Sequence, residues 1–126
     1  MLHKALWSLE KQSRRGFRGY PVATVAFYGP DDQRATKIAV GIVPAEGAEA
    51  HPLQRWFSEN TDVRSDPEIA RQIGDFIDTH QAVSVALVDR IIGCPHEEGV
   101  DYPEGTACPQ CPFWANRDRW SGKARR

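Results

Sequence analysis

Three cysteines and one histidine near the C-terminal end of the chain carry the clearest chemistry in the sequence. Cys94, His96, Cys108 and Cys111 form a C-x-H-x11-C-x2-C array that gathers every cysteine of the chain into eighteen positions. Thiolate and imidazole are ligands that Zn²⁺ prefers, structural zinc takes four of them, and a C-x2-C pair is the recurrent half of such sites. The spacing therefore predicts one Zn²⁺ held in a Cys3His site.

The sequence around these ligands favours stiff loops. Pro95, Pro109 and Pro112 each follow a cysteine, which restricts the φ angle next to three of the four ligands. Such loops lose less entropy when they close round a metal. Residues 97–105 are rich in glycine, proline and acidic residues, which predicts a loop that folds back on itself. The alternative is one disulfide with a third thiol left over, and the odd cysteine count without a secretory signal disfavours it.

The same residues also suggest an enzymatic interpretation. The sequence His96-Glu97-Glu98, followed by Cys108 and Cys111, resembles the H-x-E and C-x-x-C elements with which nucleobase deaminases hold zinc and place a glutamate. Deaminases separate these elements by a longer segment that includes a strand, and here Cys94 would occupy the position of the reactive water. We therefore favour a structural site closed by four protein ligands, and a zinc-dependent hydrolase or deaminase-type enzyme is the alternative.

Several acidic residues accompany the ligands in the loop, namely Glu97, Glu98, Asp101 and Glu104. Next to a thiolate-rich centre that already carries negative charge, carboxylates repel rather than tune the metal. We expect them to cap backbone amides or to pair with basic groups such as Arg117 and Arg119. The sequence has no phosphate-binding glycine loop, nucleophile elbow or Ser/His/Asp arrangement, and we assign no catalytic residue.

Hydrophobic patterns predict the elements that must position the metal site. Leucines at helical spacing predict a short helix over 2–13. Two runs rich in β-branched residues, 22–28 and 35–43, flank a turn at 29–34 and predict a hairpin, with Ile38, Val40 and Ile42 on one face of its second strand. Residues 44–52 are expected to form a loop, and 53–57 a short third strand.

The second half of the chain predicts a helix followed by a strand. Asp66 can cap a helix over 67–80 that begins with Pro67 and lines one face with Ile69, Ile73, Phe76 and Ile77. The nearly all-apolar run 82–88 is typical of a central strand covered on both sides, and it leads through 89–93 directly to Cys94.

These elements predict an α+β fold, with a small mixed sheet made of the hairpin plus a central C-terminal strand, a packed helix, and zinc-binding loops. The 126 residues suit a single domain: 1–20 as helix and basic segment, 21–93 as core, 94–114 as zinc-binding loops, and 115–126 as basic tail. We find neither a signal-like apolar segment nor a membrane-spanning run, and we expect a reducing cytoplasm.

Charge is distributed unevenly along the chain. The net charge is −1, with +4 in residues 1–20, −9 in 21–111 and +4 in 112–126. Arginines interleaved with aromatic residues, at 14–20 and around Trp114 and Trp120, are compatible with a single-strand nucleic-acid surface, although rings next to a zinc site more often pack over it. Because the acidic middle repels phosphate, we favour a protein over nucleic acid as the macromolecular partner.

The metal-binding segment resembles the C-terminal part of a group of small uncharacterised bacterial proteins. The resemblance lies in GCPHEEG at 93–99, DYPEG at 101–105 and CPQCPFW at 108–114, and covers about a sixth of the chain. It implies a metal site and a bacterial origin, and it attaches no activity. The function predicted from the sequence is therefore a structural-zinc domain that acts as a protein-interaction or adaptor module, with a nucleic-acid-binding module as a further alternative.

Overall fold

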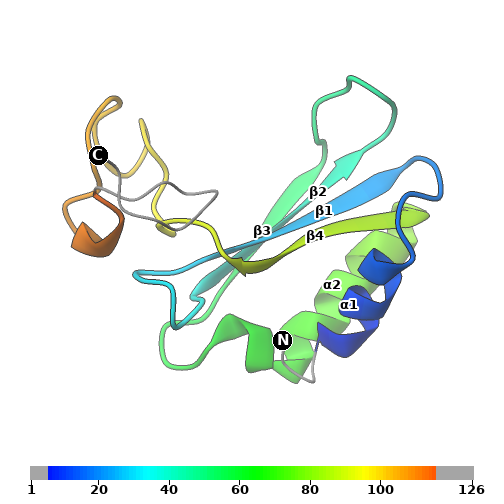
Figure 1. Ribbon diagram of the computed structural model, residues 1–126, viewed down its shortest axis with the longest axis horizontal. Helices are drawn as coiled ribbons and strands as arrows, with labels where there is room; N and C mark the ends of the chain where they lie inside the picture. Colours follow the sequence, from blue (N-terminus) through cyan, green and yellow to red (C-terminus); the bar gives the residue numbers. More distant parts are fainter. Residues whose placement is uncertain (1–5, 116–126) are drawn as a thin grey trace.

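The computed structural model describes residues 6–115, which form one mixed sheet with two helices packed on the same face (Figure 1). The helices are α1 (Trp7–Arg14) and α2 (Pro67–Thr79), the strands are β1 (Val22–Tyr28), β2 (Lys37–Val43), β3 (Leu53–Phe57) and β4 (Ser84–Ile91), and two 3-10 turns are η2 (Val63–Ser65) and η3 (Pro112–Trp114). The predicted α+β fold class is confirmed. Within the described residues, neither helix has the length and apolar character that crossing a bilayer requires.

The strand order is β3-β2-β1-β4, which combines antiparallel and parallel pairing. β1 pairs antiparallel with β2, and β2 pairs antiparallel with β3, so this part of the sheet is a meander. β4 pairs with β1 in parallel, after a crossover that contains α2. The C-terminal ends of two parallel strands lie side by side at the same end of the sheet. Accordingly, the Gly29 amide just after β1 donates to the Gly93 carbonyl just after β4, at 2.9 Å.

The core lies between the sheet and the two helices. The predicted face of β2 is confirmed, because Ile38, Val40 and Ile42 are all buried and lie opposite the alternating buried side chains of β1. The buried set comprises Ala23, Val25 and Phe27 of β1, Ile38, Val40 and Ile42 of β2, Leu6 and Leu9 at α1, and Ile69, Ile73 and Ile77 of α2. Figure 1 shows that the 44–52 loop and the metal-binding loops rise from the other face of the sheet, which α1 and α2 leave uncovered.

The prediction of a central strand over 82–88 is wrong, because β4 is the outermost strand on one side of the sheet. Its apolar run is explained by helices: Val85 and Leu87 pack into the core beneath α1 and α2, whereas Ala86 on the opposite face is exposed. The strand also begins later than predicted. The Ala82 amide donates to the Ile77 carbonyl and closes the end of α2, so pairing with β1 starts at Ser84.

The other boundaries follow the predicted elements closely. The helix predicted over 2–13 is present as α1 from Trp7, and residues 1–5 lie outside the described part of the chain. The Asp66 carboxylate caps α2 as predicted, accepting hydrogen bonds from the backbone amides of Glu68 and Ile69 at 2.9 and 3.2 Å. β2 begins at Lys37 rather than at residue 35, because the Ala35 amide donates to Asp62 instead of entering the sheet.

Asp62 joins η2 to the turn between β1 and β2. Its carboxylate accepts the amides of Ala35 and Arg64 at 3.1 and 2.9 Å, and the Arg64 guanidinium at 2.8 and 2.7 Å. Burial alone would raise the pKa of Asp62, but the hydrogen bonds from Arg64 and Ala35 outweigh burial and lower it. The ionised carboxylate therefore stabilises the folded chain.

Asp62→Asn should lower the free energy of unfolding at neutral pH by about 1–3 kcal/mol, the usual worth of hydrogen bonds to a charged group. A lowered folded-state pKa means that the contribution is present above the unfolded pKa of about 3.9 and is lost as the pH falls through the folded value. Urea unfolding at several pH values should show the gap to wild type closing in acid. A gap that stays constant from neutral to acid pH would contradict this, and Asp78→Asn on the exposed side of α2 is the control.

Candidate metal centre

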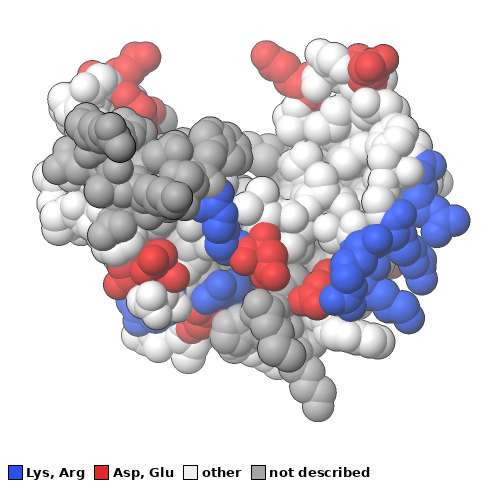
Figure 2. Space-filling model, in the orientation of Figure 1, with Lys and Arg blue, Asp and Glu red and all other residues white. Residues whose placement is uncertain are grey.

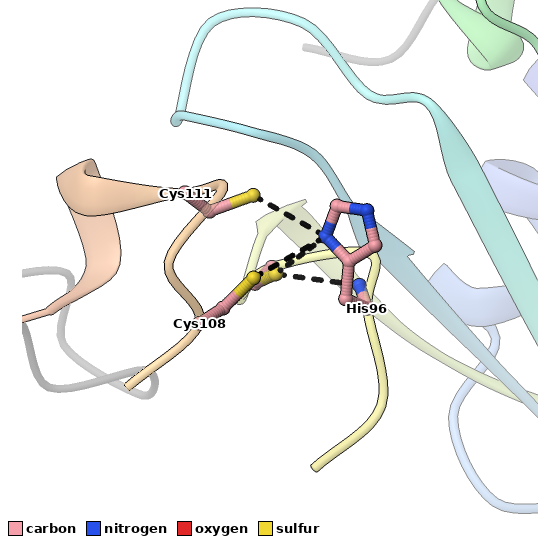
Figure 3. A group of neighbouring side chains, drawn as sticks. His96, Cys108 and Cys111 are labelled. Carbon is pink, nitrogen blue, oxygen red and sulfur yellow. Dashed lines mark hydrogen bonds between the residues drawn. The ribbon is translucent and has the colours of Figure 1, made fainter. Parts of the chain in front are cut away.

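The structure brings the four predicted ligands together. The ligand atoms of Cys94, His96, Cys108 and Cys111 all lie within 4.8 Å of one another. His96 Nδ1 is 3.3, 3.4 and 3.5 Å from the sulfur atoms of Cys94, Cys108 and Cys111 respectively. Figure 3 shows the imidazole ring of His96 directed at the sulfurs of Cys108 and Cys111, which approach it from another loop. The chain thus forms a Cys3His group able to hold a metal ion.

The dimensions of the group fit tetrahedral zinc. With Zn–S near 2.3 Å and Zn–N near 2.0–2.1 Å, a tetrahedral angle places sulfur and nitrogen ligands about 3.6 Å apart. The observed separations of 3.3–3.5 Å lie close to that value, and Nδ1 is the ring nitrogen that faces the sulfurs. Three thiolates and one imidazole also form a donor set that binds zinc in preference to harder cations such as Mg²⁺. The group is therefore consistent with a zinc-binding site.

The cysteines are shielded from solvent, and this affects their protonation. Cys94, Cys108 and Cys111 are 9%, 8% and 2% exposed. Burial raises the pKa of the Cys94 thiol, partly opposed by the hydrogen bond from the His96 amide to its sulfur. Burial and the neighbouring Cys94 thiol together raise the pKa of Cys111. Thiolates at this position need a compensating positive charge, which a bound divalent cation supplies as it displaces the protons.

Two contacts attach the metal-binding loops to the sheet at Gly29. The Gly29 amide donates to Gly93, the residue before Cys94, and the Gly29 carbonyl accepts the indole Nε1–H of Trp114 at 2.8 Å. A Cβ at this position would lie 2.0 Å from the Arg34 carbonyl oxygen, so only glycine fits. Both halves of the ligand set are thus fastened to one residue at the end of β1.

Trp114 also links the metal centre to the main core. Its side chain packs against the cluster formed by the three cysteines and against the core beneath the sheet. The Phe113 ring meets it edge-on, with centroids 5.0 Å apart. The prediction that aromatic residues next to the ligands pack over the site is confirmed for Trp114. Trp120 and the basic groups at 117–126 lie outside the described residues.

The acidic residues of the loop hold its backbone in place. Asp101 accepts the Glu97 amide at 2.7 Å, and Glu98 accepts the Gly105 amide at 2.6 Å. The Gly99 amide donates to the Tyr102 carbonyl at 2.8 Å, which closes the loop on itself as predicted. Amide capping is therefore confirmed for Asp101 and Glu98, whereas the expected partners Arg117 and Arg119 lie outside the described residues.

Lys37 is a contributor to the site that sequence reasoning missed. Its side chain is 5% exposed, and its ammonium donates to the Pro95 carbonyl, between Cys94 and His96, at 3.1 Å. Glu97 lies 3.7 Å away, and the rings of Tyr28 and Phe57 lie 5.1 and 5.8 Å away. Burial lowers the pKa of Lys37, opposed by the neighbouring Glu97 carboxylate. A buried cation therefore supports the backbone that joins two of the ligands.

A second basic residue holds the same loop from β3. Arg55 forms an ion pair with Glu97 at 3.1 Å, and Glu97 thereby connects two neighbouring strands to the metal-binding loop. The alternation of β2 places Lys37 on the face opposite the helices, where a lysine normally points to solvent. Residues 94–98 return over that face and contact Lys37, beside the rings of Tyr28 and Phe57. No local pattern in the sequence predicts such a long-range contact.

No known protein family, curated protein or solved structure matches this chain. The resemblance of the metal-binding segment to a group of bacterial proteins stays a prediction, and the functional argument is carried by the geometry described above.

Lys37→Met keeps most of the side-chain volume and removes the charge and the bond to Pro95. Groups that orient metal ligands typically contribute 10–100-fold to metal affinity, so zinc release to a chelator should be about tenfold faster or more. A colorimetric zinc indicator measures the rate, and circular dichroism checks the fold. Lys11→Met, at an exposed position on α1, is the matched control. Release at the wild-type rate from a folded Lys37→Met protein would rule out this role.

Proposed function

We propose that this chain is a small α+β module that binds one structural Zn²⁺ and works by binding a macromolecule rather than by catalysis. The observation that carries the proposal is the convergence of four buried or partly buried protein ligands at tetrahedral spacing. Four protein ligands fill the coordination of zinc, whereas catalytic zinc needs one position for water or substrate. The metal then serves to fold and fasten the loops of residues 94–114.

The surroundings of the ligands support a structural rather than a deaminase-type centre. Cys94 is within the ligand group, at the place where an enzyme of that type would hold the reactive water. Glu98, the glutamate of the H-x-E sequence, accepts the Gly105 amide and so serves the backbone of the loop. The ligand loops also form hydrogen bonds with Gly29 and Lys37 of the sheet region, as expected for a metal centre that stabilises the loops around it.

The surface next to the metal centre supports a protein partner. A cavity of about 530 Å³ lies between the metal-binding loops and the end of β3, lined by residues that include Phe57, Pro95, His96 and Val100. Phe57 is 62% exposed and Val100 is 77% exposed. Exposed apolar side chains beside a cavity, bordered by charged residues such as Arg34 and Asp101, are typical of protein interaction sites. Zinc would hold Val100 and its loop in place for such a contact.

Protein purified without a chelator should contain one zinc per chain by elemental analysis. Because each thiolate fills one coordination position, Cys94→Ser, Cys108→Ser and Cys111→Ser should each lose the metal, and His96→Ala should weaken its binding strongly. His51→Ala and His80→Ala are matched controls, since neither histidine belongs to the ligand group. Wild-type protein that is free of zinc, or cysteine variants that keep it, would refute the metal assignment.

Zinc removal should act locally. Because the closure of the site is coupled to the folding of its loops, chelation should abolish amide-exchange protection across 94–114. The β1–β2 hairpin and α2, which have a core of their own, should keep their protection. Hydrogen exchange followed by mass spectrometry distinguishes the two regions. Protection that persists throughout 94–114 after zinc removal would contradict a structural role.

A further inference from the structure

A strip of basic and aromatic side chains covers α1 and the loop that follows it. The strip consists of Trp7, Lys11, Arg14, Arg15, Phe17, Arg18 and Tyr20, all of them exposed. Its rings are unusually open to solvent, with Trp7, Phe17 and Tyr20 at 57%, 68% and 40% exposure. Four cations against the single acid Glu10 give residues 6–20 a net charge of +3. Figure 2 shows the basic side chains gathered on the right of the molecule, over α1 and this loop.

The backbone beneath the strip is held in place by a buried serine. Ser84, at the start of β4, is 5% exposed. Its hydroxyl donates to the Gly19 carbonyl and accepts the Arg18 amide, both at 2.7 Å. Gly16 and Gly19 have φ angles of 76° and 114°, which glycine adopts without strain. The exposed rings and guanidinium groups therefore project from an anchored turn.

Cations lie between the rings along this strip. Trp7, Lys11 and Arg14 share one face of α1, with the Lys11 ammonium 5.3 Å from the Trp7 ring centroid. Beyond the helix, Phe17 and Tyr20 form an edge-to-face pair with centroids 5.2 Å apart, and Arg18 lies between them in the chain. Arg15 and Arg18 also line a cavity of about 360 Å³ together with Gln12 and the exposed Val83. Positive charge and open ring surface thus occur together at both ends of α1.

We propose that this strip binds single-stranded nucleic acid, with Lys11, Arg15 and Arg18 at the phosphates and the exposed rings stacked on bases. Single-strand sites combine a basic track for the backbone with aromatic platforms for successive bases, and they need no base-specific groups. The strip supplies both on one surface. Rings for the bases and cations for the phosphates therefore lie side by side on it.

Two features favour a single strand over other partners. Protein interfaces concentrate aromatic residues in a central patch with a polar rim, whereas rings and cations are interleaved here. Duplex DNA is usually read by a helix inserted in the major groove, whereas α1 has eight residues and packs along β4. The preference for a protein partner at the level of sequence rested on the net charge of −9 over residues 21–111, and the metal-binding loops that hold four of these acidic residues lie at the opposite end of the sheet from the strip (Figure 1).

The experiment measures fluorescence anisotropy of labelled oligouridylate and oligothymidylate of about 12 nucleotides with the full-length protein. We expect micromolar binding of the single strands at low salt and weaker binding of a duplex of equal length. With about 0.7 counterion released per phosphate contact, three cations predict a log–log salt slope near −2. Affinity should therefore fall about 15-fold between roughly 50 and 200 mM salt.

Variants then locate the site. Arg15→Glu with Arg18→Glu should weaken binding about tenfold or more and flatten the salt slope, because phosphate contacts are lost. Phe17→Ala with Tyr20→Ala should weaken it at least about fivefold and leave the slope unchanged, because stacking releases no counterions. Arg71→Glu is the control, because Arg71 is an exposed arginine on α2 that belongs neither to the strip nor to the cavity beside the metal centre. Circular dichroism and zinc content confirm that each variant is folded.

Four outcomes would overturn the proposal: no binding at low salt, equal affinity for the duplex, unchanged binding by the Arg15/Arg18 variant, or tighter binding of polyglutamate than of the oligonucleotides. The third would place any nucleic-acid contact elsewhere, for example in the basic segment 115–126, and the fourth would indicate an acidic protein as partner. The strip is independent of the metal ligands, so each of these outcomes is distinguishable from failure of the structural-zinc proposal, which zinc content tests directly.

Discussion

The parallel pairing of β1 with β4 is the constraint on which the rest of this structure depends. It makes two strands that are far apart in the chain end at the same edge, with Gly29 and Gly93 in direct hydrogen-bond contact. Cys94 follows Gly93 at once, and Trp114 returns to bond the Gly29 carbonyl. In an antiparallel arrangement the end of β4 would lie at the opposite edge, and neither Lys37 nor Gly29 could reach the ligand loops.

The metal centre and the sheet stabilise each other through charge as well as through packing. A zinc ion with three thiolates and one imidazole would carry net negative charge, and within residues 6–115 the basic side chains of Lys37 and Arg55, on adjacent strands, contact its loop. Both cations pair with Glu97 of the loop, so two positive charges on the sheet face the negative charges of Glu97 and of the ligand group. This arrangement lets a thiolate-rich centre lie against a sheet face without an uncompensated charge.

Local patterns in the sequence predicted most of the elements, and long-range contacts account for what they missed. Ligand spacing identified Cys94, His96, Cys108 and Cys111, because metal chemistry restricts both residue types and separations. Alternation identified the buried face of the hairpin, and Asp66 marked the start of α2. The position of β4 in the sheet could not be predicted from the sequence, because an apolar run does not show whether neighbouring strands or packed helices bury it. The burial of Lys37 could not be predicted for a related reason, since its hydrogen-bond partner in the loop, Pro95, lies 58 positions further along the chain.

The position of the ligands after the last strand also has a consequence for biosynthesis. A ribosome makes the chain from its N-terminal end, so all four strands and both described helices are synthesised before Cys94 leaves the exit tunnel. The residues that contact the ligand loops, Gly29 and Lys37, are therefore made well before the ligands themselves. The pairing of β1 with β4 brings Gly93 and Trp114 to the same glycine, so the four ligands can meet in a chain whose β1–β4 register is correct, and a metal ion would bind to such chains in preference.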